Sequence, residues 1–158
     1  MAEKKYQIII DKILSKSELF DEVLQTHEDV KGFFENEMKC KNLPNGFVPF
    51  MQVFDGITFP GFSVFAIGSK DTIQMTYQKY SSEEAVEGFC SDYKMRSTNS
   101  KLFFFATDNR GGRYAFKKDV ADEKIYYFTR DNIDSVITYP SFENLLEEKV
   151  DAYLKINN

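Results

Sequence analysis

The spacing of hydrophobic residues at the start of the chain is helical. Apolar side chains recur three and four positions apart, which predicts an amphipathic helix; they belong to Tyr6, Ile9, Ile10, Ile13 and Leu14. Ser17 has a side chain suited to an N-cap, so we expect a further short helix there. Its apolar residues are Leu19, Phe20, Val23 and Leu24. The acidic pair Glu28-Asp29 favours the start of another long helix, which carries Val30, Phe33, Phe34 and Met38 and ends near Asn42.

A shorter helix is predicted directly after Leu43-Pro44, because proline is tolerated in the first turn of a helix. Its apolar face consists of Phe47, Phe50, Met51 and Phe54. We expect Asp55-Gly56 to end this helix, since glycine is common just beyond a helix C-terminus. From Ile57 to Tyr77 the apolar residues alternate or form short groups, which is typical of strands and turns. Ser81 and the acidic residues after it then predict a helix that extends to Tyr93.

The stretch from Lys101 to Lys118 predicts a central β-hairpin. Leu102 to Ala106 is an almost continuous apolar run, which is typical of a strand that is covered on both faces. Tyr114 to Phe116 forms the returning strand. The turn between them is assigned to residues that favour turns, which are Asp108, Asn109, Gly111 and Gly112. Asp and Asn side chains bond their own backbone, and we expect the glycines to supply positive φ.

The last part of the chain predicts two more strands and a final helix. The strands are Lys124 to Thr129 and Ser135 to Tyr139, and Ser141 is placed to cap the helix. The inward-facing residues of that helix are Phe142, Leu145, Leu146 and Val150. The fold class is therefore α+β, with a mainly antiparallel sheet flanked by N-terminal helices, a middle helix and a C-terminal helix. We expect one domain over residues 1–158, because no linker or repeat divides the chain.

Three stretches carry a family resemblance. They are the hairpin Phe105-Ala-Thr-Asp-Asn-Arg-Gly-Gly-Arg-Tyr-Ala-Phe116, the segment from Leu43-Pro44 to Asp55-Gly56, and Pro140-Ser-Phe-Glu-Asn-Leu-Leu-Glu147. In this order and at these spacings they resemble the SMI1/KNR4-like (SUKH) superfamily, over roughly residues 25 to 155. Arg110 stands where the family often has a third small residue, and the chain has no Trp, so the subfamily is left open.

Charge argues against nucleic acid as the main partner. The net charge is −5 and the pI is near 5.0, whereas nucleic-acid binders usually present a basic face. The acidity is concentrated in residues 119–158, which hold nine acidic residues against four basic ones. Arg110 to Arg113 with the aromatic residues that follow could stack on bases, and this remains the alternative.

Candidate chemistry is sparse, and we expect neither catalysis, a metal nor a cofactor. His27 is the single histidine, and Cys40 and Cys90 have no neighbouring His or Cys. Asp108 begins a stretch that is superficially similar to a calcium loop, but Arg110 stands where a ligand oxygen is needed. No segment approaches the roughly 20 apolar residues of a membrane span. We therefore expect a cytoplasmic protein.

The resemblance implies a protein that binds another protein. Many bacterial SUKH members are immunity proteins that bind and block a cognate toxin, often a nuclease, and the alternative is a regulatory or scaffold module of the SMI1/KNR4 type. An acidic chain suits a basic toxin domain as partner. The candidate contact residues lie in predicted loops and strand ends, and they are Asp119, Asp122, Glu123, Asp131 and Asp134. The oligomeric state is left open.

Overall fold

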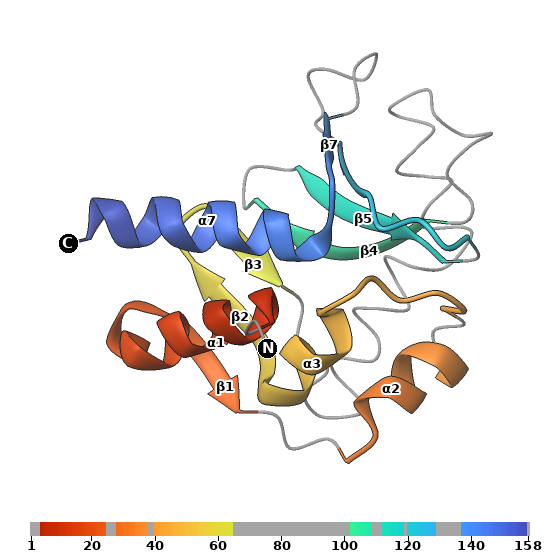
Figure 1. Cartoon of the computed structure of the whole chain (residues 1–158), viewed down its shortest axis with the longest axis horizontal. Helices are drawn as coiled ribbons and strands as arrows, with labels where there is room; N and C mark the ends of the chain where they lie inside the picture. Colours follow the sequence, from red (N-terminus) through yellow and green to blue (C-terminus); the bar gives the residue numbers. More distant parts are fainter. Residues whose placement is uncertain are drawn as a thin grey trace.

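The fold is an antiparallel sheet with helices packed against it (Figure 1). The computed structural model describes residues 4–24, 28–37, 40–64, 102–108, 112–118, 120–128 and 137–157. Within these ranges, seven strands pair in chain order, so each strand is antiparallel to the next. The predicted α+β class with an antiparallel sheet is confirmed.

The strands of the sheet are short. They are β1 (Asp21–Leu24), β2 (Phe54–Phe59), β3 (Phe62–Val64), β4 (Leu102–Thr107), β5 (Arg113–Lys117), β6 (Ile125–Phe128) and β7 (Ile137–Tyr139). The predicted hairpin is present as the β4–β5 pair, in which Phe103 faces Phe116 and Thr107 faces Arg113. Leu102 to Ala106 are all buried, as expected for a strand covered on both faces.

The helices come from both ends of the chain and from the segment before β2. They are α1 (Lys5–Ser15), the 3₁₀ turn η1 (Ser17–Leu19), α2 (Val30–Gly32), the π-helical η2 (Phe33–Glu37), α3 (Phe47–Val53) and α7 (Phe142–Ile156). Figure 1 shows α7 running across the sheet, and α1 packs against α7. The predicted cap of the last helix is confirmed, because the Ser141 hydroxyl accepts the backbone N–H of Asn144 at 3.1 Å.

Three predicted boundaries were wrong. After η1, the chain enters β1 instead of a second helix, and Phe20 is already extended and buried. The long helix expected from Val30 is only one turn of α2 followed by the π turn η2. Asp55-Gly56 does not end α3, because α3 stops at Val53 and both residues lie in β2. In each case tertiary packing overrides a short local pattern. The strands and the helix expected between residues 65 and 100 lie outside the described residues.

One phenylalanine joins the helical layer to the sheet. The ring of Phe47 in α3 is fully buried, with centroids 4.9 Å from Phe34 and 5.2 Å from Phe142 of α7. It also lies 5.7 Å from Phe105 of β4 and 5.4 Å from Phe116 of β5. All four contacts are edge-on, the geometry that aromatic quadrupoles favour. α2/η2, α3, α7 and the central hairpin therefore share one aromatic core.

Truncation of this ring should destabilise the whole domain. We expect Phe47→Ala to lower the free energy of unfolding by roughly 3 to 5 kcal/mol, because it removes four ring contacts and leaves a cavity. Leu14→Ala is the control, since Leu14 lies on the outer face of α1 with 45% of its surface exposed; its cost should stay below about 1 kcal/mol. Denaturant titration measures both, and similar losses for the two variants would contradict this assignment of the core.

Candidate protein-binding site

The turn of the central hairpin is held by a carboxylate. Asp108 Oδ1 accepts the backbone N–H of Gly112 at 2.9 Å, and Asp108 Oδ2 accepts a hydrogen bond from the Tyr127 hydroxyl. The Thr107 hydroxyl donates to the Gly112 carbonyl at 2.9 Å. Asp108 is therefore part of the turn that its sequence position indicated. Asn109 and Gly111, the other two turn residues, lie outside the described residues.

The expectation that Gly112 has a positive φ was wrong. Among the described glycines, Gly46, Gly56 and Gly61 have positive φ, whereas Gly112 does not. Instead, a Cβ atom at Gly112 would lie 2.5 Å from both Asp108 Oδ2 and the Tyr127 hydroxyl. A side chain at this position would have to displace Asp108 or Tyr127, and a turn pattern in the sequence does not reveal that contact.

Tyrosines line the sheet beside this turn. The rings of Tyr114 and Tyr127 face each other across β5 and β6 with centroids 4.6 Å apart, and Tyr139 of β7 lies 6.1 Å from Tyr114. The Lys149 ammonium of α7 lies 5.9 Å from the centre of the Tyr114 ring. Burial, and next to it the neighbouring Tyr139, raise the pKa of Tyr114 above its ordinary range. Tyr114 therefore stays neutral at physiological pH, and Lys149 links α7 to the tyrosines of β5 and β7.

Of the predicted acidic contact residues, Asp122 is engaged within the protein. Its carboxylate accepts the backbone N–H of Lys124 at 3.0 Å and the Tyr126 hydroxyl at 2.7 Å, and it lies 3.9 Å from Lys117 Nζ. Burial opposes ionisation, but the hydrogen bonds from Tyr126 and Lys124 and the nearby Lys117 hold the pKa of Asp122 below its ordinary value of 3.8. Burial and Asp122 together raise the pKa of Tyr126 to about 12.

Glu123 ties the loop before β6 to the loop before α3. Its side chain is exposed, yet Oε1 accepts the backbone N–H of Asn45 at 2.9 Å. The same two loops meet where the Lys118 carbonyl accepts the N–H groups of Lys41 and Asn42, at 2.9 and 3.0 Å. Asp119, Asp131 and Asp134 lie outside the described residues. Asp122 and Glu123 therefore lie in one loop, and both carboxylates accept hydrogen bonds from backbone N–H groups.

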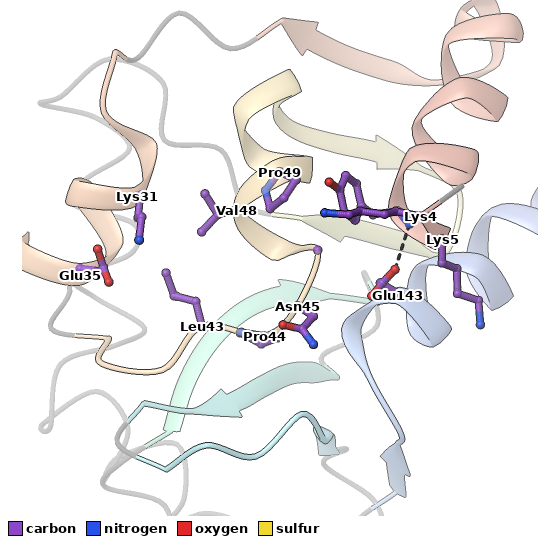
Figure 2. Close-up of a pocket in the computed structure, with 12 residues that line it drawn as sticks. Lys4, Lys5, Lys31, Glu35, Leu43, Pro44, Asn45, Val48, Pro49 and Glu143 are labelled. Carbon is purple, nitrogen blue, oxygen red and sulfur yellow. Dashed lines mark hydrogen bonds between the residues drawn. The ribbon is translucent and has the colours of Figure 1, made fainter. Parts of the chain in front are cut away.

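A groove opens on the other side of Asn45 (Figure 2). It has a volume of about 720 Å³ and lies between the start of α1, the α2/η2 segment and the loop that leads into α3. Its apolar lining comes from Leu43, Pro44, Val48 and Pro49, and Figure 2 shows Lys4 and Lys31 on opposite walls. This groove could not be predicted from the sequence pattern, because its walls come from segments that are far apart in the sequence.

The wall of the groove at α1 is built by contacts with α7. Glu143 Oε2 accepts the backbone N–H of Tyr6 at 2.9 Å. This carboxylate therefore provides an acceptor for one of the N–H groups in the first turn of α1, which have no partner within the helix. Lys5 Nζ donates to Asn144 Oδ1 at 2.5 Å and lies 3.4 Å from Glu147. Gly46 has φ of 83°, and a Cβ there would lie 2.9 Å from Glu143 Cγ. Close packing of three segments therefore shapes the groove.

In the described part of the chain, no group of three His, Cys, Asp or Glu side chains is arranged to hold a metal ion. No helix within the same ranges is long and apolar enough to cross a membrane. Cys40 is buried, and His27 and Cys90 fall outside the described ranges.

The steric role of Gly112 can be tested by a double-mutant cycle. Gly112→Ala should cost about 1 to 3 kcal/mol of stability, because the new methyl group overlaps Asp108 and Tyr127. Tyr127→Phe removes the nearest hydroxyl, so the two changes should couple by about 0.5 kcal/mol or more. In the control cycle, the stability changes caused by Gly61→Ala and Tyr127→Phe should add, since no atom lies within 4 Å of a Cβ at Gly61. Additive thermal unfolding data for Gly112→Ala and Tyr127→Phe would contradict the steric contact between position 112 and Tyr127.

The lowered pKa of Asp122 predicts a pH dependence of stability. As pH falls, the unfolded chain protonates this carboxyl first, so its contribution is complete above the ordinary pKa and disappears as pH falls through the folded-state value. Asp122→Asn retains one oxygen, which can accept the Lys124 N–H, and its amide does not titrate. Denaturant titrations between about pH 6 and about pH 3 should therefore show a larger loss for the wild type than for the variant. Parallel curves would contradict the lowered pKa.

Comparison with known proteins agrees with the resemblance in the sequence. The SMI1 / KNR4 family (SUKH-1) matches residues 26–148, which is well over half of the chain. The matched region includes α3, the β4–β5 hairpin and the first turns of α7. No curated protein matches the chain. The chain belongs to the SMI1 / KNR4 family (SUKH-1).

Proposed function

We propose that this protein is an immunity protein that binds and neutralises a cognate toxin, without chemistry of its own. The observation that carries the proposal is family membership over residues 26–148, because many bacterial SUKH members have this role. We place it in the cytoplasm of the toxin-producing cell, where such a protein must act.

Charge supports a basic partner. A nuclease toxin has to hold phosphates and therefore needs a basic face, whereas this chain has a net charge of −5. Complementary charge accelerates encounter and disfavours wrong partners. The acidic residues proposed to meet the toxin are those of the segment from Asp119 to Asp134.

The structural use of carboxylates supports binding over catalysis. Asp29, Asp108, Asp122 and Glu143 each accept a backbone N–H, so each one stabilises a turn or a helix start. A general acid or base must instead lie free to reach a substrate, with its pKa near the working pH. The pKa of Asp122 is instead lowered, so its carboxyl group is ionised at neutral pH.

Co-expression with the cognate toxin tests the proposal. We expect this protein to restore growth of a bacterial host that expresses the toxin, and to elute with the toxin as one complex. An unrelated nuclease of similar charge is the control and should remain toxic. A toxin that kills equally well in the presence of this protein would contradict the proposal, and several weak partners instead of one would favour the scaffold alternative.

The acidic segment is tested in the same complex. Asp131→Lys with Asp134→Lys should slow association at least tenfold, as charge steering predicts, and the difference should shrink as salt rises. Asp122 and Glu123 are left unchanged because their carboxylates accept hydrogen bonds from backbone N–H groups. Glu18→Lys with Glu28→Lys makes the same charge change at exposed residues elsewhere and serves as the control. Equal association rates for the two double variants would remove Asp131 and Asp134 from the interface.

A further inference from the structure

We propose that the groove before α3 docks an extended peptide segment of a protein partner, in which acidic residues flank an apolar side chain. None of the acidic residues proposed to meet a toxin lines this groove, and the charge it prefers is the opposite one. The inference therefore goes beyond toxin neutralisation and does not depend on it.

The apolar lining of the groove is the reason to expect an apolar side chain in the ligand. Leu43, Val48 and Pro49 line it while remaining only half-buried, so they keep apolar surface that a partner could cover. The volume of about 720 Å³ falls within the usual range for ligand sites. An apolar side chain placed there would gain roughly 25 cal/mol for each Å² removed from water.

The charges that remain available in the groove are mainly positive. Glu143 accepts the Tyr6 N–H at the start of α1, and Lys5 is paired with Glu147, so both charges are already engaged within the protein. Lys4 lies over the Tyr6 ring at 5.8 Å. Lys31 is exposed and makes no ion pair with any other described residue, and Glu35 is the remaining acid in the lining. Two ammonium groups on opposite walls thus favour a ligand with acidic residues on both sides of its apolar anchor.

The groove is held in shape before a ligand arrives. Pro44 and Pro49 restrict the backbone of the loop and of the first turn of α3. Gly46 lies against Tyr6 and Glu143, and the Asn45 N–H is bound by Glu123. Little conformational freedom remains to be lost in this loop. The entropic cost of binding therefore comes mainly from ordering the peptide.

Peptide phage display on the full-length protein tests the proposal without any known partner. A random library should yield peptides in which Asp or Glu flank a bulky apolar residue. Synthetic peptides with the enriched sequences should bind the wild type saturably, as followed by fluorescence anisotropy. They should also shift the NMR methyl signals of Leu43 and Val48. A library that yields basic peptides, or shows no enrichment of acidic ones, would overturn the proposal.

A matched pair of variants assigns the binding to the groove. Lys4→Glu with Lys31→Glu should weaken binding of the selected peptides at least tenfold. Lys16→Glu with Lys155→Glu makes the same charge change at exposed lysines that do not line the groove, and it should leave binding within about twofold. Thermal unfolding checks that both variants fold. Equal binding to the two variants would overturn the proposal, whereas neutralisation of the toxin is measured separately and would be unaffected by that result.

Discussion

The edge-on packing of aromatic rings around Phe47 is the interaction on which the rest of the structure depends. Phe47 contacts Phe34, Phe105, Phe116 and Phe142, which belong to four different elements. The strands of the sheet are only three to six residues long, so ladder hydrogen bonds alone would leave them marginal. A shared aromatic core lets short strands and short helices form one stable unit.

Acidic side chains organise the loops around that core. Asp108 closes the hairpin turn, Asp122 and Glu123 hold the segment before β6, and Glu143 satisfies the start of α1. A charged acceptor makes a stronger hydrogen bond to a backbone N–H than a neutral one does. The described parts of these loops are therefore tied to other segments, and a loop that is ordered beforehand lowers the cost of any binding.

The parts of the fold that could be predicted from sequence are those with a strong local signal. The apolar run of β4 and the Ser141 cap of α7 are examples, and both carry their cause within a few residues. The β1 strand could not be predicted, because its extension follows from pairing with β2, some thirty residues away. The same holds for Gly112, whose constraint comes from Tyr127, and for the groove, whose walls come from distant segments.

Our central proposal is that the acidic segment from Asp119 to Asp134 binds the toxin, while the aromatic core is already formed in the free protein. Amide hydrogen exchange of the protein, free and bound to its cognate toxin, tests this claim most directly. We predict that amides of this segment gain the most protection, whereas those of β4 and β5 gain only the uniform amount that binding adds to global stability. A gain that is confined to other surfaces, or that is no larger in this segment than in the core strands, would contradict the account.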